Sequence, residues 1–186
     1  MPRFGALLTG LCLVLAGCGN SRTPAPSLTR PATAGTLGLV RYPAGGVSFL
    51  APRSWTVVPE PAPMVTVLTS GGAAVAVWRY PLSGRRPSSE GQLEGARRSL
   101  IAAVRAQDPS VDVLGSRLLK VDGSPAIELE SIERVDDQLR HSRATHVFAR
   151  RSEIVVDEYA PVGVFRSVDG AVFAPLDRSL VVSPGA

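Results

Sequence analysis

The chain has 186 residues, enough for one ordinary domain with a short tail and too few for two domains. It is 45% hydrophobic and 19% charged, so it holds enough apolar material for a core, which excludes wholesale disorder. Twenty basic residues against sixteen acidic ones give a net charge of +4, but the longest basic runs are pairs, so we expect no nucleic-acid binding.

The N-terminus carries an export signal. Arg3 precedes an uncharged apolar stretch, residues 4–16, which is too short to span a bilayer and is typical of a signal peptide. The tetrad Leu15-Ala16-Gly17-Cys18 then matches the bacterial lipobox. We therefore predict cleavage between Gly17 and Cys18 and attachment of fatty acyl chains such as palmitate to Cys18.

Two boundaries follow from this cleavage. Residues 1–17 form the signal peptide, so Cys12 is discarded and the mature chain has no free thiol once Cys18 is lipidated. Residues 18–35 are rich in Pro, Thr, Ser and Ala without periodicity, which is typical of a disordered tether. Residues 36–183 are expected to form a single domain on the extracytoplasmic face of the cell membrane, anchored through the lipid on Cys18.

The first part of this domain is rich in strand patterns. The pair Gly71-Gly72 between two β-rich runs indicates a hairpin. The expected strands are residues 36–42, 47–51, 55–58, 65–69 and 73–80.

A helix is expected next, over about residues 89–106. Ser89 and Gln92 have the spacing of a capping box, and apolar residues then recur every three or four positions. Asp108-Pro109 ends the pattern, because the residue before proline is pushed out of the helical region.

The remainder predicts an antiparallel meander and a terminal helix. Strands are expected over 111–121, 126–135, 140–150 and 154–159, with turns over residues 122–125 and 136–138. Apolar residues from 168 to 180 have helical spacing, and Pro175 requires this helix to start or kink there.

The order of these elements resembles a known family. The first hairpin reads Val47-Ser48-Phe49-Leu50-Ala51-Pro52-Arg53-Ser54-Trp55, and a later turn reads Gly123-Ser124-Pro125-Ala126. With one helix in mid-chain and another at the end, residues 36–183 are similar to PsbP-like proteins, and especially to actinobacterial lipoproteins of the Lpq type. Ser54 departs from the pattern, in which glycine before the tryptophan is usual.

The resemblance implies an α+β fold, an antiparallel sheet with helices packed on it as an α-β-α sandwich. It also implies a non-enzymatic binding or assembly domain. Because members of such a fold differ in their partners, it implies no active site.

The residues themselves favour no catalytic, metal or cofactor site. His141 and His146 are five apart on one expected strand and point to opposite faces, so they cannot chelate one metal. Glu128 and Glu130 share a face, which we interpret as the solvated side of the sheet, with His141 or Arg143 as cross-strand partners. Asp136-Asp137 is interpreted as turn chemistry rather than a calcium site.

The aromatic residues are the remaining candidates for ligand contact. Trp55, Trp78 and Tyr80 belong to a small aromatic set, and Trp78 and Tyr80 share a strand face. Core packing is the simpler interpretation of these residues. If they border an opening between sheet and helix, they are the first candidates for a ligand site.

Two functions remain open from the sequence. The first is a membrane-anchored lipoprotein that serves as a non-enzymatic binding or assembly module for an envelope protein or wall polymer. The second is a carrier of a small apolar ligand or lipid, in a pocket between sheet and helix lined by residues such as Trp78, Leu93 and Leu100.

Overall fold

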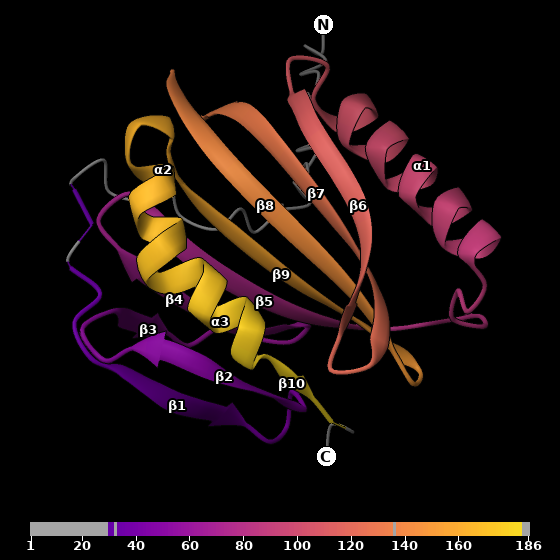
Figure 1. The fold of residues 1–186 in the computed structure, drawn as a ribbon, viewed down its shortest axis with the longest axis horizontal. Helices are drawn as coiled ribbons and strands as arrows, with labels where there is room; N and C mark the ends of the chain where they lie inside the picture. The colour runs from indigo at the N-terminus through magenta and orange to yellow at the C-terminus, as the bar shows by residue number, and fades with distance from the viewer. Residues whose placement is uncertain (1–29, 32, 136, 184–186) are drawn as a thin grey trace, which may run out of the picture.

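A computed structural model describes residues 30–31, 33–135 and 137–183. Within these ranges ten strands form two sheets, a seven-stranded one in the order β3-β4-β5-β9-β8-β7-β6 and a three-stranded one in the order β1-β2-β10 (Figure 1). All of the strand pairs are antiparallel.

The large sheet contains β3 (Thr56–Val58), β4 (Met64–Ser70), β5 (Ala73–Pro81), β6 (Asp112–Val121), β7 (Ser124–Val135), β8 (Gln138–Ala149) and β9 (Ser152–Pro161). The small sheet contains β1 (Leu37–Tyr42), β2 (Val47–Pro52) and β10 (Val181–Val182).

Tight hairpins set the register of the large sheet. The turn expected over residues 122–125 is shorter than predicted, because Val121 pairs with Ser124 and leaves Asp122-Gly123 as a two-residue loop. Both loop residues have positive φ (48° and 73°), as a type I′ turn requires. The expected Gly71-Gly72 hairpin between β4 and β5 is confirmed, and Gly71 has a φ of 53°. These short loops keep sequential strands adjacent from β6 to β9.

Helix α1 (Glu90–Gln107) begins where the capping box predicted. The Ser89 hydroxyl accepts from the Gln92 backbone N–H at 3.3 Å, and the Gln92 side chain accepts from the Ser89 N–H at 3.2 Å. The helix packs mainly on β6 and β7, and none of its residues, all of which the structure describes, is fully buried. It therefore covers one side of the sheet only loosely.

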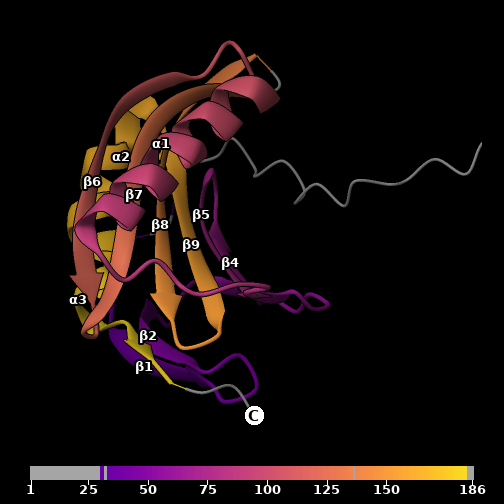
Figure 2. The same ribbon diagram turned by 90° about the vertical axis from the view of Figure 1, so that its right-hand side faces the viewer.

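The C-terminal helix covers the opposite side of the sheet (Figure 2). It runs continuously from α2 (Val162–Val168) through a π-helical turn, η1 (Asp169–Phe173), into α3 (Ala174–Ser179). Pro175 lies in the first turn of α3, directly after the wider turn, in which the Ala174 N–H donates to the Asp169 carbonyl. A proline has no N–H to place in a helical ladder, and Pro175 directly follows this wider turn. The helix does not start at Pro175, one of the two expected outcomes, because it already begins at Val162.

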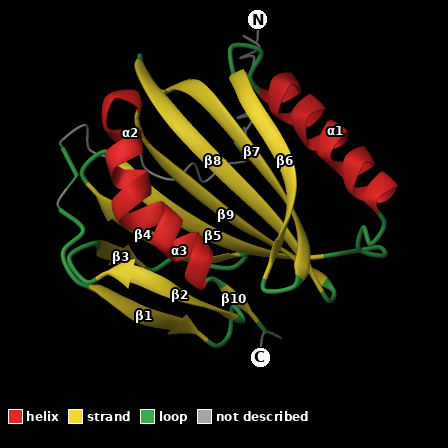
Figure 3. Cartoon of the chain, viewed as in Figure 1, coloured by secondary structure: helices red, strands yellow, loops and turns green. Residues whose placement is uncertain are grey.

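The core lies between this helix, the large sheet and the small sheet. Phe49, Phe173 and Leu176 are fully buried there, and Trp55 packs edge-to-face on Phe173 with ring centroids 6.3 Å apart. Figure 3 shows the α2–α3 segment lying across one face of the large sheet, and Figure 2 shows α1 on the other side. The expected α+β architecture, an α-β-α sandwich, is confirmed.

The packed region begins slightly before residue 36. The Ser54 hydroxyl donates to the backbone carbonyls of Thr33 and Ala34 at 3.3 and 3.4 Å, and Ala34 packs against the core. Ser54 is the position that departs from the family pattern, and its hydroxyl here holds the incoming chain. No helix within the described ranges is long and apolar enough to cross a membrane.

Candidate functional site

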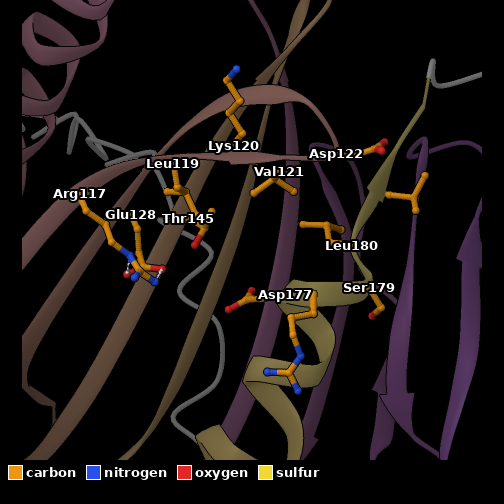
Figure 4. Close-up of a pocket in the computed structure, with 12 residues that line it drawn as sticks. Arg117, Leu119, Lys120, Val121, Asp122, Glu128, Thr145, Asp177, Ser179 and Leu180 are labelled. Atoms are coloured by element: carbon orange, nitrogen blue, oxygen red, sulfur yellow. Dashed lines mark hydrogen bonds and ion pairs between the residues drawn. The ribbon is translucent and has the colours of Figure 1, made fainter.

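A cleft of about 520 Å³ opens between the large sheet and α3 (Figure 4). Its sheet wall comes from β6, β7 and β8, and its other wall comes from α3 and the start of β10. Asp122, in the β6–β7 turn, accepts a hydrogen bond from the Val182 N–H at 3.0 Å and ties the two walls together at one end. Its volume falls in the range of small-molecule and side-chain binding sites.

Strand alternation places a polar and an apolar group of side chains in this cleft. On β6, Arg117, Leu119 and Val121 face the same side because they are two residues apart. Glu128 of β7 is the register partner of Arg117. Leu180, at the end of α3, closes the apolar part of the cleft.

Glu128 is a buried acid, and the interpretation of its face as solvated is wrong. The residue is 7% exposed, because α3 covers this side of the sheet. Arg117 holds it with two contacts of 2.8 Å, from Nε to Oε1 and from one terminal nitrogen to Oε2. The hydrogen bonds that Arg117 donates to Glu128 raise the pKa of Arg117, so its guanidinium stays charged.

Behind the cleft, Arg143 of β8 is the centre of a buried charge cluster. It contacts Glu158 of β9 at 2.6 Å, Asp169 of η1 at 2.8 Å and Asp177 of α3 at 3.0 Å. Glu158 is 1% exposed, and its Oε1 has no hydrogen-bond partner among the described residues. One guanidinium thus joins the sheet to the middle of the C-terminal helix, at Asp169, and to its last turns, at Asp177.

This cluster holds more negative than positive charge. Burial raises the pKa of Glu158 well above its ordinary value, and the neighbouring Asp177 raises it further. Burial also raises the pKa of Asp177 to about 6, against the opposing effect of Arg143. Glu158 and Asp177 therefore share the single guanidinium group of Arg143 in the protein interior.

The two histidines lie on opposite faces, as expected. His141 pairs with Glu130 at 2.6 Å, which confirms one of the anticipated cross-strand partners, and it stacks on Phe165 with ring centroids 3.7 Å apart. His146 pairs with Glu153 at 2.7 Å on the α1 side. Arg143, the other anticipated partner, binds Glu158 instead.

The aromatic candidates are not brought together. Trp55 is 5% exposed in the core, whereas Trp78 and Tyr80 face the α1 side of β5. In the sheet order β9 and β8 separate β5 from β7, so Trp78 lies about 14 Å from the strands on which α1 packs. The structure thus gives Trp78 and the α1 residues Leu93 and Leu100 different parts of this face.

A carboxylate near Trp78 has no partner. Asp157 of β9 lies between Ala76 and Ala144, and no hydrogen bond or ion pair reaches it from the part of the chain that the structure describes. Burial raises its pKa to about 6, more than nearby Arg140 and His146 lower it. Arg140 itself lies over the Tyr159 ring at 4.1 Å and pairs with Glu133 at 2.9 Å.

Other expected sites stay predictions. Gly17 and Cys18, the cleavage and lipidation residues, lie outside the described residues. Among the residues that are described, no group of three His, Cys, Asp or Glu side chains is placed to hold a metal ion.

The Arg143 cluster was missed by sequence reasoning, although a signal existed. Ile154, Val156 and Ala160 alternate on the core face of β9, and Glu158 falls at the same spacing. A charged residue at a core-facing position requires a buried partner. Which partner it finds depends on strand register and on how α3 packs.

The architecture defines a protein with a PsbP-like fold, as the sequence indicated. The cyanobacterial PsbP protein (CyanoP) of Synechocystis sp. PCC 6803 superposes with a TM-score of 0.62 at 17% identity, over 90% of this chain and 98% of that one. LpqN, involved in cell envelope biogenesis of Mycobacterium tuberculosis, gives 0.58 at 14% identity, over 80% of this chain and 91% of that one. PA94 of Pseudomonas aeruginosa gives 0.54 at 14% identity, over 81% and 99% of the two chains. No family model and no curated protein matches the sequence.

Proposed function

We propose that this protein is an extracytoplasmic lipoprotein, anchored through Cys18, whose domain serves as a non-enzymatic binding or assembly module for another envelope component. The observation that carries the proposal is the open cleft between β6–β8 and α3, on a domain that follows a lipobox. LpqN, which shares the fold, is involved in cell envelope biogenesis, and this agrees with an envelope role here.

Two features favour binding over catalysis. The two histidines lie on opposite faces of the sheet and neither lines the cleft, so no imidazole is placed there as a general base. In the cleft, Glu128 is held by Arg117 and Asp177 by Arg143, which is typical of a preformed recognition surface.

The alternative is a carrier of a small apolar ligand. The charged lining of the cleft disfavours it, and so does the distance between Trp78 and the strands under α1. A lipid or apolar ligand of several hundred daltons, retained by the protein in native mass spectrometry after gentle extraction from host membranes, would support the carrier instead.

The anchor and the module are tested separately. Cys18→Ala should release the protein from the membrane fraction or leave it unprocessed, and normal processing with membrane retention would contradict the lipoprotein assignment.

For the binding module, a photo-crosslinking amino acid is placed in cells at Val181, which lines the cleft and is 47% exposed, or at Val57, which is 50% exposed on β3. We expect a discrete adduct from position 181 and none from position 57. Equal adducts, or none from either, would contradict partner binding at the cleft.

A further inference from the structure

The interior of the cleft presents polar groups that are incompletely bonded. Thr145 of β8 is 3% exposed and lines the cleft, yet its hydroxyl has no hydrogen bond to any residue that the structure describes. Because this hydroxyl lines an open cleft and no other described side chain holds it, a group that enters the cleft can bond to it. Figure 4 shows Thr145 on the wall between Glu128 and Asp177.

The carboxylates next to this hydroxyl outnumber the guanidinium groups that bind them, while the other two cations of the lining, Lys120 and Arg178, are exposed. Glu128, Glu158, Asp169 and Asp177 share two guanidinium groups, those of Arg117 and Arg143. Asp177 is bound by Arg143 through Oδ2 only, which leaves its Oδ1 free to accept. A positively charged donor in the cleft would meet both a free carboxylate oxygen and a free hydroxyl.

The rest of the lining fits an alkyl chain. Leu119, Val121 and Leu180 form the apolar part of the cleft beside Thr145. A cation carried on a short methylene chain buries its stem on such side chains while its charged end reaches the polar ones. Lys120 and Arg178, the cations at the rim, have no ion pair within the described ranges, and Lys120 points away from Glu128 and Asp177 (Figure 4).

From these observations we propose that the cleft between β6–β8 and α3 binds an alkylammonium group, with Thr145 and Asp177 as its hydrogen-bond acceptors. The inference rests on the proposed function and names the chemical group that its binding site recognises. Two sources supply this group, a lysine side chain of a partner protein or a free amine. Both have the same charge, donors and methylene stem.

The test is a methyl-detected NMR titration of the full-length protein with cadaverine, and with 1,5-pentanediol as the neutral molecule of the same chain length. We expect cadaverine to shift the methyl signals of Thr145, Leu119 and Leu180, and pentanediol to leave them in place. This comparison needs no variant. Absence of cadaverine shifts, or equal shifts with the diol, would overturn the proposal.

Two substitutions then locate the site. Thr145→Val keeps the side-chain shape and removes a hydroxyl that has no partner, so the fold is retained, and Asp177→Asn keeps the side-chain size. Each is expected to weaken cadaverine binding about tenfold, as for loss of a hydrogen-bond partner to a charged group. Asp112→Asn, an exposed acid on β6 that does not line the cleft, is the matched control and should leave affinity unchanged. Unchanged affinity in both cleft variants would place the amine elsewhere.

The two sources are separated with peptides. The peptide acetyl-Gly-Lys-Gly-amide is titrated beside acetyl-Gly-Gln-Gly-amide. Binding of the lysine peptide identifies a protein side chain as the source, whereas binding of cadaverine alone identifies a free amine. If no amine binds but position 181 still forms its crosslink, only the alkylammonium chemistry fails; if amines bind and no crosslink forms, only the docking function fails.

Discussion

Asp157, a carboxylate without a partner among the described residues, is expected to lower the stability of the folded protein at neutral pH. Burial raises the pKa of Asp157 from 3.8 to about 6. Between these values the folded protein holds a proton that the unfolded chain has lost, so this group's contribution to stability falls as the pH rises from about 4 to 6. We therefore expect Asp157→Asn to increase the free energy of unfolding at pH 7.5 by about 2 kcal/mol.

The difference between variant and parent isolates Asp157 from the other titrating acids. Urea unfolding at several pH values should show the gain shrinking as the pH falls and disappearing near pH 4. Asp137→Asn, an exposed residue in the β7–β8 turn, is the matched control. A gain of the same size at pH 4 and pH 7.5 would show that packing, and not the charge, is responsible.

At the scale of elements, α1 is packed more loosely against the sheet than the C-terminal helix. Its 18 residues include Gly91 and Gly95 and no fully buried side chain, whereas the C-terminal helix buries residues on α2, η1 and α3. Arg97 joins it to the sheet by donating to Ser116 at 3.1 Å. Its stability therefore depends on its own helix propensity and its capping box to an unusual degree.

Gly95→Ala is expected to stabilise the protein by about 1 kcal/mol, because a β-carbon at this position meets open space and alanine favours a helix. Gly123→Ala is the matched comparison, since its β-carbon also meets open space but its φ is +73°. That backbone disfavours alanine, so we expect a loss of about 1 kcal/mol. Urea unfolding measures both changes, and the same sign for both would contradict this explanation.

How far the sequence predicts the structure depends on the range of the interactions. Asp122-Gly123, Gly71-Gly72 and the Ser89–Gln92 capping box are local, so their turns and the start of α1 were predicted. The cleft is not local, because it exists only where α3 packs against β6, β7 and β8. The prediction that Glu128 lies on a solvated face is wrong for the same reason. The alternation of β7 shows which side chains share a face, but α3, some 50 residues later in the chain, determines that the face of Glu128 is covered.

For the molecule as a whole, Arg143 is the residue that joins its layers. It bonds to Glu158 within the sheet, to Asp169 at the start of η1 and to Asp177 within α3. The same helix carries Phe173, on which Trp55 packs, and its Ser179 hydroxyl accepts from the Leu50 N–H of the small sheet at 2.8 Å. The position of α3, and with it one wall of the cleft, therefore depends on this buried charge cluster.

Removing Arg143 alone should cost far more than removing it together with Glu158. Arg143→Met leaves Glu158 at 1% exposure without its cation, and loss of one partner of a buried pair typically costs about 3–5 kcal/mol. In the double variant Arg143→Met, Glu158→Met no buried charge is stranded, so we expect most of that loss to be recovered. Urea unfolding at pH 7.5, followed by tryptophan fluorescence because Trp55 contacts Phe173, gives the coupling between Arg143 and Glu158.

In the single variant the loss of stability should also shrink at pH 5, since Glu158 without Arg143 takes up a proton more readily. Additive effects, or a single-variant loss that does not change with pH, would show that shape rather than charge holds α3 against the sheet.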